Sequence, residues 1–315
     1  MKNWFLRLCE THVGLASLLL LLTSLVLTSS GFALPSDHPV PLTRTNGARA
    51  MQYLRDVVAF GPRPAGSAGH KKLELYLRNR LNGDHLEFDN FTAITPVGKV
   101  PMSNLIVKFP GTTDGIIVVA GHYDTAGTVP KFVGANDGGS STALLLELAN
   151  HLRMKRLQGY SVWLVWLDGE EAMQQWSDAD GRYGSRHLAQ EWQNNGTARK
   201  IKACLLADMI GDADLNIEHD QSSTPWLEDL IYRAATALGY QSHFFGRTVG
   251  MEDDHTSFIA SGMPAAELID YDYGYNNAYW HTTEDSIDKL SPKSLQIVGD
   301  VLLGVIQLLN SHDTQ

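Results

Sequence analysis

The stretch Trp166-Leu167-Asp168-Gly169-Glu170-Glu171-Ala172-Met173 closes an apolar run that begins at residue 161. Side chains of adjacent residues diverge, so the two glutamates do not easily grip one metal ion together. One carboxylate is then suited to bind a metal ion. Its neighbour would face the substrate, with a pKa suited to general acid/base catalysis. The alternative is a solvated acidic turn, which the apolar run and the surrounding tryptophans disfavour.

Similar apolar runs recur along the chain, and we expect strands at residues 104–109, 115–120, 161–167, 202–207 and 265–269. Most are continuously apolar instead of alternating, as in strands that are covered on both faces. Helical patterns lie between them and at both ends, at residues 48–60, 69–81, 140–156, 183–194, 226–238 and 292–310. The sequence therefore predicts a single globular α/β domain over residues 46–315, with a central, mainly parallel twisted sheet flanked by helices.

Polar side chains that suit a metal site follow several of the expected strands: His122, Asp137, the Glu170-Glu171 pair, Asp208 and His281. Open α/β sheets build ligand sites at the carboxyl ends of their strands. Asp137, one glutamate and His281 complete a ligand set that leaves one zinc position open, as a catalytic site requires. Taken alone, His122 is more typical of a hydrogen-bonded core residue and Asp137 of a helix N-cap. Their joint occurrence favours zinc-assisted chemistry on a peptide.

The composition argues against several other classes of protein. With 43% hydrophobic and 19% charged residues, the 315-residue chain has ample material for a core. Its net charge of −10, without basic clusters, argues against nucleic acid and anionic membranes as partners. Cys9 lies near the N-terminus, and Cys204 stands in an apolar stretch. We expect Cys204 to be a buried small hydrophobe and expect no intramolecular disulfide.

The N-terminus carries the pattern of an export signal. Lys2 and Arg7 precede an apolar run at residues 13–27, and Gly31-Phe32-Ala33 offers a small-x-small cleavage site. This predicts a signal peptide over residues 1–33, with an uncleaved membrane anchor as the alternative. The mature protein is then secreted or periplasmic and has no membrane contact. The proline-rich residues 34–45 are expected to be extended.

The chain resembles a known family at this point. Asp168-Gly169-Glu170-Glu171-Ala172, Trp176-Ser177 and Tyr183-Gly184-Ser185-Arg186-His187-Leu188-Ala189 are similar to the animal-type glutaminyl cyclases, or glutaminyl-peptide cyclotransferases. That family shares an ancestral fold with co-catalytic zinc aminopeptidases. The similarity extends over nearly all of the chain after the leader, through Gly134-Ala135-x-Asp137, Leu206-x-Asp208-Met209-Ile210-Gly211, Asp253-Asp254-His255 and Trp280-His281-Thr282.

The resemblance implies a reaction and a role for each matching position. The substrate is a peptide or protein with N-terminal glutamine, which is converted to pyroglutamate with release of ammonia, and we expect a monomer. One zinc ion is held by Asp137, Glu171 and His281. Glu170 is the general acid/base, assisted by Asp208, with Asp253 in the same network. Trp176 and Trp280 wall the pocket, although either tryptophan also suits a core.

The chain departs from the family pattern at three places. Glu267 stands where animal members have a histidine, so that histidine's role does not transfer. We expect Glu267 at the substrate site, as a carboxylate in a related hydrogen-bond network. Gly121 and Thr142 stand where animal enzymes have a cysteine pair. Residues 270–279, rich in Tyr and Asn, are expected to shape the pocket rim, so the family's peptide preference beyond the first residue does not transfer.

Two rival functions remain. A two-zinc aminopeptidase would use five ligands and Glu170 to activate a bridging water; the ligands would be His122, Asp137 as the bridge, Glu171, Asp208 and His281. All five residue types are present, so counting ligands does not exclude it, whereas the motifs favour the cyclase. A catalytically silent binding domain should have lost a ligand or the base, and none is missing from the sequence.

Overall fold

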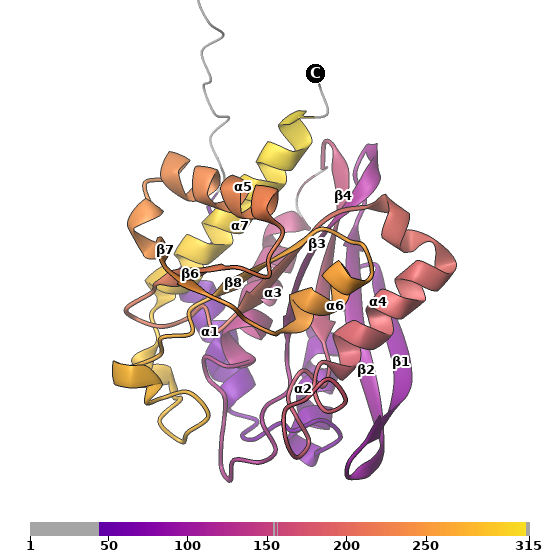
Figure 1. The fold of residues 1–315 in the computed structure, drawn as a ribbon, viewed down its shortest axis with the longest axis vertical. Coiled ribbons are helices and arrows are strands. Elements are labelled where there is room, and N and C mark those ends of the chain that lie inside the picture. The colour runs from indigo at the N-terminus through magenta and orange to yellow at the C-terminus, as the bar shows by residue number, and fades with distance from the viewer. Residues whose placement is uncertain (1–43, 154, 156, 313–315) are drawn as a thin grey trace, which may run out of the picture. The chain divides into compact units, whose positions relative to one another are not determined.

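A computed structural model describes residues 44–153, 155 and 157–312. The predicted leader at residues 1–33 and residues 34–43 of the expected extended segment lie outside the described residues. The described part is organised around a six-stranded sheet with the strand order β1-β2-β4-β3-β5-β8 (Figure 1). The bounds are Leu86–Thr95 for β1, Gly98–Phe109 for β2, Thr113–His122 for β3, Tyr160–Leu167 for β4, Ile201–Asp208 for β5 and Ala265–Ile269 for β8.

Strand direction confirms the predicted mainly parallel sheet. β4, β3, β5 and β8 run parallel to one another, and β2 and β1 extend the sheet at one edge as antiparallel strands. In the register, His122 at the end of β3 pairs with Leu167, and Asp208 at the end of β5 pairs with Ile269. The carboxyl ends of the four parallel strands therefore meet at one edge of the sheet.

Helices cover both faces of this sheet (Figure 1). The bounds are Gly47–Val58 for α1, Ala68–Arg80 for α2, Gly139–Leu152 for α3, Tyr183–Asn195 for α4, Pro225–Ala237 for α5, Asp254–Ala260 for α6 and Pro292–His312 for α7. Six of these were predicted, and α3 ends earlier than expected. The short helix α6 was not predicted. Neither were β1 and a small separate sheet formed by β6 (Ile217–Asp220) and β7 (Phe244–Val249).

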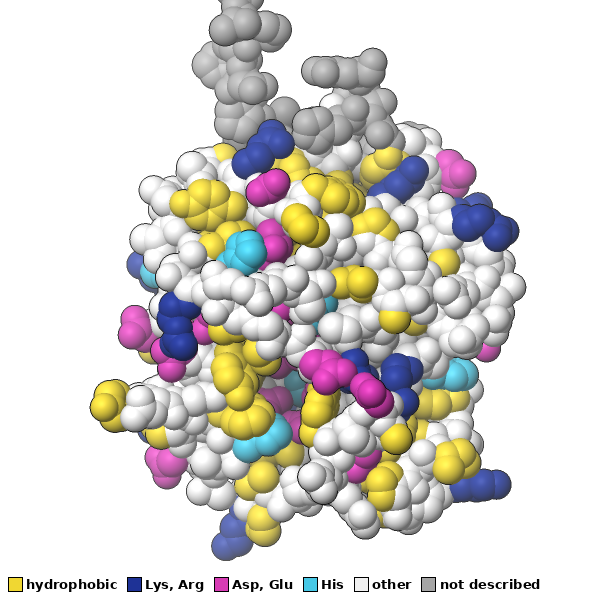
Figure 2. Space-filling model, in the orientation of Figure 1, with side chains coloured by type: hydrophobic (Ala, Val, Ile, Leu, Met, Phe, Trp, Pro, Cys, Tyr) yellow, Lys and Arg dark blue, Asp and Glu magenta, His cyan; other side chains and the backbone are white. Residues whose placement is uncertain are grey.

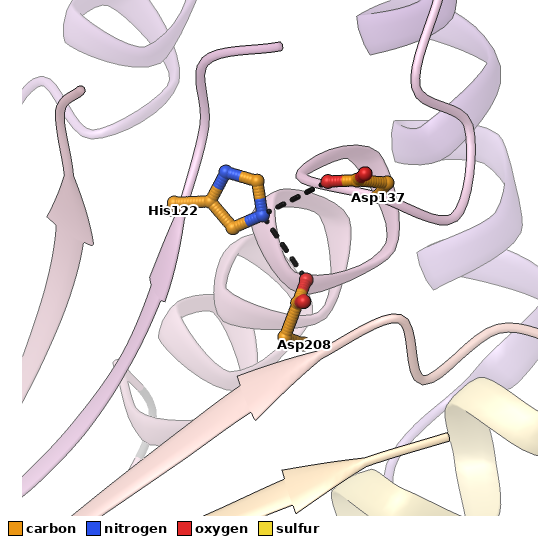
Figure 3. Close-up of side chains that lie close together, drawn as sticks. All are labelled: His122, Asp137 and Asp208. Atoms are coloured by element: carbon orange, nitrogen blue, oxygen red, sulfur yellow. Dashed lines mark hydrogen bonds and ion pairs between the residues drawn. The ribbon is translucent and has the colours of Figure 1, made fainter. Parts of the chain in front are cut away.

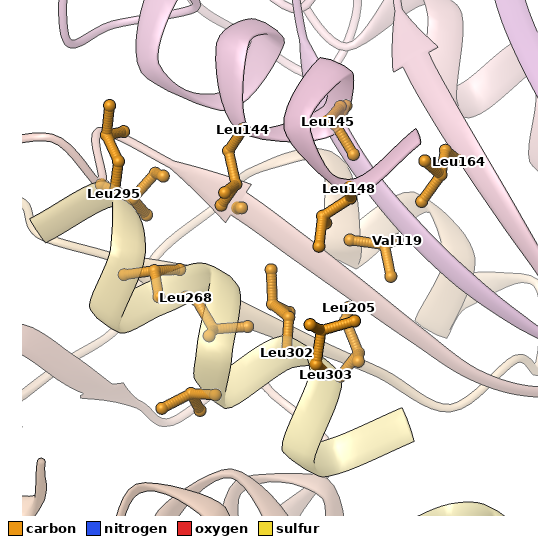
Figure 4. Close-up of a cluster of buried hydrophobic side chains, with 14 of the residues drawn as sticks. Val119, Leu144, Leu145, Leu148, Leu164, Leu205, Leu268, Leu295, Leu302 and Leu303 are labelled. Atoms are coloured by element: carbon orange, nitrogen blue, oxygen red, sulfur yellow. The ribbon is translucent and has the colours of Figure 1, made fainter. Parts of the chain in front are cut away.

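The core explains why the strands are continuously apolar. Val119, Leu164 and Leu205 point from the sheet toward the leucines of α3 and α7 (Figure 4). The residues next to them in each strand, such as Val118, Val165 and Leu206, pack under α4 and α6. Each fully buried aliphatic side chain contributes roughly 1.5–3 kcal/mol of hydrophobic stabilisation. Both faces of the sheet are thus fixed by packing, which holds the strand ends in place.

Helix α7 is also the one described helix that is long and apolar enough to cross a membrane by length and composition, between Pro292 and Ser311. Most of that stretch is buried inside the protein, and Leu295, Val298 and Leu302 lie in the core. Core packing therefore accounts for its composition. Cys204 in β5 is a buried free cysteine, as predicted, and burial raises the pKa of its thiol.

Candidate active site

The polar residues expected at the strand ends come together at the carboxyl edge of the sheet. His122 and Asp208 are the last residues of β3 and β5. Asp137 lies in the loop before α3, and the glutamate pair follows β4 directly. His281 comes from the long segment after β8. Four strand ends therefore supply one cluster, as parallel sheets favour.

The first group of candidate metal ligands consists of Asp137, Glu171 and His281, whose ligand atoms all lie within 4.8 Å of one another. Nε2 of His281 is 3.2 Å from Oδ2 of Asp137 and 3.3 Å from Oε1 of Glu171. Although buried, that Glu171 oxygen accepts no hydrogen bond from the described residues. An unsatisfied buried carboxylate beside Asp and His is a donor set that fits Zn²⁺.

A second group shares Asp137 with the first (Figure 3). Nε2 of His122 lies 3.2 Å from Oδ1 of Asp137 and 3.1 Å from Oδ1 of Asp208. The backbone N–H of Met209 also donates to Oδ1 of Asp208, over 2.8 Å. Asp137 thus presents one oxygen to each histidine, which is the geometry of a bridging carboxylate.

Asp124 positions the glutamate pair. It is 1% exposed, and its two carboxylate oxygens accept the backbone N–H groups of Glu170 and Glu171 over 3.1 and 3.2 Å. Oδ1 of Asp124 also lies 3.5 Å from Nδ1 of His122. Asp124 was not predicted to have a role in the site, although it lies two residues after His122 at the same strand end.

Burial and mutual repulsion dominate the electrostatics of the cluster. Burial, with the charge of Asp137 adding to it, raises the pKa of Glu171 to about 7. Burial and the charge of Asp253 raise the pKa of Glu170 well above its ordinary value. Asp137 behaves in the opposite way: burial alone would raise its pKa, but hydrogen bonds from His122 and His281 lower it. The site therefore gathers several buried carboxyl groups whose ionisation is opposed by burial and mutual repulsion, and a bound cation would favour their ionised forms.

A cavity of about 490 Å³ opens over this cluster, in the hollowed centre of the face shown in Figure 2. Glu170, Glu171, Asp208 and Asp253 line its floor, and its other lining residues include Trp176, Met251, Ile269, Tyr271 and Trp280. The ring of Trp280 stacks on His281, with centroids 4.2 Å apart, and Tyr271 meets Trp280 edge to face. Tyr271 belongs to the segment that we expected at the rim. Met251 and Ile269 were not predicted to line the cavity.

Glu267 does not line this cavity, so the expected contact with substrate is not met. Its side chain is buried in β8, and its Oε2 lies 2.9 Å from Nδ1 of His255. The other nitrogen of His255 lies 3.0 Å from Oδ2 of Asp220. Burial and the charge of Asp253 raise the pKa of Glu267 well above its ordinary value. Glu267 therefore belongs to a buried network with His255 and Asp220, outside the lining of the cavity.

The chain is similar in sequence and in structure to known proteins. The model of peptidase family M28 matches residues 104–306. The glutaminyl-peptide cyclotransferase-like protein of Bos taurus is 34% identical over 282 residues, which cover 79% of this chain and 72% of that protein. The crystal structure of a glutaminyl cyclase from an Acidobacteriales bacterium is 46% identical, with a TM-score of 0.85 over 89% of this chain and 100% of that one. The glutaminyl cyclase of Porphyromonas gingivalis is 27% identical, with a TM-score of 0.75 over 85% and 99%.

Proposed function

This chain belongs to the glutaminyl-peptide cyclotransferases of peptidase family M28, and we propose how its own residues carry out that reaction. The enzyme converts the N-terminal glutamine of a peptide to pyroglutamate. The α-amine forms a bond to the γ-carbonyl carbon of the same residue, and the carbon–nitrogen bond to the side-chain amide breaks. Ammonia leaves, so atoms balance without water. The observation that carries the proposal is an Asp–Glu–His group with two buried carboxylates, beside a second glutamate that lines the same cavity and belongs to neither group of candidate ligands.

In this proposal Asp137, Glu171 and His281 would hold one zinc ion. A bound ion would supply Lewis-acid polarisation of the γ-carbonyl. The three side chains come from separate segments, so the fold itself sets their spacing. Asp124 fixes the backbone of Glu171, and the ring of Trp280 restrains His281 from the cavity side. The unsatisfied oxygen of Glu171 supports the assignment, because a ligand bond would satisfy it.

Glu170 transfers a proton from the attacking α-amine to the leaving amide nitrogen. It lines the cavity but belongs to neither group of candidate ligands, so its carboxylate remains available to substrate. It accepts a proton from the attacking α-amine and returns it to the leaving amide nitrogen, which departs as ammonia. Burial and the charge of Asp253 raise the pKa of Glu170 well above its ordinary value, which makes its carboxylate a stronger proton acceptor than an exposed one. Asp208 and Asp253, whose carboxylates also line the floor, hold Glu170 and the leaving amide in line.

The aromatic walls exclude water from the polarised carbonyl. Water would hydrolyse the amide instead of letting the α-amine close the ring, so a dry cavity favours cyclisation. Trp176 and Trp280 both line the cavity, and Trp176 is 39% exposed at its mouth. They hold the aliphatic part of the glutamine side chain.

Trp280→Ala is expected to raise KM about tenfold or more, because it removes an apolar wall and leaves water beside His281. Steady-state kinetics on a glutamine-initiated peptide measure this, with zinc content recorded in parallel. Trp226→Ala is the matched control, since Trp226 is an exposed tryptophan on α5, outside the cavity lining. Equal KM values for the two variants would reduce Trp280 to a packing residue.

A two-zinc aminopeptidase is the second candidate, and one observation favours it. His122 and Asp208 form a second ligand group around the shared Asp137, which is what a co-catalytic pair of ions requires. Both functions place Glu170 as the base, so the number of ions and the product distinguish them.

The assay of a glutamine-initiated peptide beside a leucine-initiated peptide tests the proposal directly. We expect loss of one ammonia from the first, no cleavage of the second, about one tightly bound zinc per chain and loss of activity with a chelator. Mass spectrometry and metal analysis measure all four. Free N-terminal amino acids together with two bound ions would assign the site to an aminopeptidase instead.

We also propose that the enzyme acts outside the cytoplasm as a monomer on peptides or proteins with N-terminal glutamine. The basic start, the apolar run and the small-x-small site within residues 1–33 support export.

A further inference from the structure

The loop that carries Asp137 is held through its backbone by two buried side chains from distant parts of the chain. Arg63 donates hydrogen bonds to the backbone carbonyl groups at the start of this loop, residues 133–137. Asp285 accepts hydrogen bonds from the backbone N–H groups at the end of the loop. Neither residue belongs to the candidate ligands or lines the cavity described above.

Arg63 is 0% exposed, and its guanidinium serves the loop with two nitrogens. Nη1 donates to the carbonyl oxygen of Val133 over 2.6 Å, and Nη2 donates to that of Gly134 over 3.0 Å. Burial lowers the pKa of Arg63 to about 10, so the group still carries its charge at neutral pH. A planar fork with fixed donors suits two successive carbonyls.

Asp285 is also 0% exposed, and it supplies the acceptors at the other end of the loop. Its Oδ1 accepts the backbone N–H of Asn136 over 2.7 Å, and its Oδ2 accepts that of Asp137 over 3.2 Å. The phenol of Tyr273 donates to Oδ1 over 2.9 Å. Because Asp285 lies four residues after His281, it ties the segment of one proposed zinc ligand to the loop of another.

We propose that Arg63 and Asp285 act as a hydrogen-bonded clamp that positions Asp137 against His281 and thereby sets how firmly the enzyme retains zinc. This inference rests on the zinc ligands proposed above. The two side chains satisfy opposite ends of one short loop, so the loop has little freedom to shift without breaking a buried hydrogen bond. Partners behind the ligands typically change metal affinity by about 10- to 100-fold when they are removed.

The backbone of His281 makes the clamp necessary. His281 has a φ of 50°, in the left-handed region that a non-glycine residue adopts only when its surroundings enforce it. Asp285 provides that enforcement, because it anchors the segment after His281 to the Asp137 loop. Without the anchor, the segment can relax toward an ordinary φ and carry the imidazole away from Asp137.

Asp285→Asn tests the clamp on the full-length, zinc-loaded enzyme. The amide has one acceptor oxygen in place of two, so one of the two loop N–H groups loses its partner. We expect zinc to dissociate into excess chelator about tenfold faster or more than from the unaltered enzyme. Asp300→Asn is the matched control, because Asp300 is an equally buried carboxylate that accepts the N–H and hydroxyl of Thr45 far from the site. A purely structural role would lower thermal stability in both variants without changing the rate of zinc release.

Two milder variants keep the test decisive if Asp285→Asn does not fold. Tyr273→Phe removes only the phenol donor to Asp285, and Arg63→Lys replaces the two-pronged donor with a single ammonium. Both should release zinc several-fold faster. Unchanged release from every folded variant, with zinc still bound by the unaltered enzyme, would overturn the clamp alone. An unaltered enzyme that binds no zinc would overturn the ligand assignment and the clamp together.

Discussion

Glu170→Gln should abolish turnover, lowering kcat by roughly 10²–10⁴-fold, while zinc content and folding stay near those of the unaltered enzyme. Glutamine has nearly the shape of glutamate, but it neither accepts the proton of the α-amine nor returns one to the leaving nitrogen. The backbone N–H of residue 170 keeps its bond to Asp124, so the turn after β4 should hold its position. The loss should therefore appear in kcat, with metal binding intact.

The surroundings of Glu170 make this variant a clean probe. The charges of Asp253 and Glu171 both oppose ionisation of Glu170, so a neutral amide relieves repulsion and creates none. Glu252→Gln is the matched control: Glu252 also lines the cavity, but its carboxylate is paired with Arg182 at 2.8 Å. Kinetics, zinc analysis and thermal melting of the two variants together test the role. If Glu170→Gln kept most of its activity, Glu170 would not be the acid/base.

The sequence predicted the part of the fold whose pattern is strongest. The parallel strands are apolar on both faces because helices cover both sides, and that continuous pattern is readable without a structure. β1 was missed because most of its residues are partly or fully exposed. The four- and six-residue strands of the small sheet and the seven-residue α6 are too short to show a period. Such elements are stabilised by contacts with distant parts of the chain, and a short stretch of sequence does not show those contacts.

In the candidate site, too, some residues were predictable from the sequence and others were not. Parallel sheets bind ligands at the carboxyl ends of their strands, and this rule predicted from the sequence that His122, Asp208 and the glutamate pair lie in one cluster. The partners that hold them were not predictable in this way. Arg63 and Asp285 are separated by more than two hundred residues and meet only around the Asp137 loop. The place of Glu267 behind the cavity depends on side-chain direction in β8, which a one-residue shift in register would reverse.

Glu171→Gln should lose zinc as well as activity, because it removes a charged ligand from the group with Asp137 and His281. Metal analysis after gel filtration should find well under one ion per chain, and kcat should fall at least as far as in Glu170→Gln. Added zinc should restore little activity, since a neutral amide oxygen is a poorer zinc ligand than a carboxylate. Normal metal content in this variant, with metal loss in Glu170→Gln, would show that the two glutamates have the opposite roles.

Thermal melting separates lost metal from a damaged fold. In the metal-free protein, burial and the charge of Asp137 raise the pKa of Glu171 to about 7, so an ionised Glu171 opposes folding at neutral pH and above. Glutamine removes that repulsion, and the metal-free variant should therefore melt no lower than the metal-free parent. Zinc binds only the folded state and should raise the Tm of the parent by mass action, whereas the variant should gain little. A metal-free variant that melts well below its parent would mean that Glu171 supports the fold itself, and its loss of activity would then say nothing about zinc.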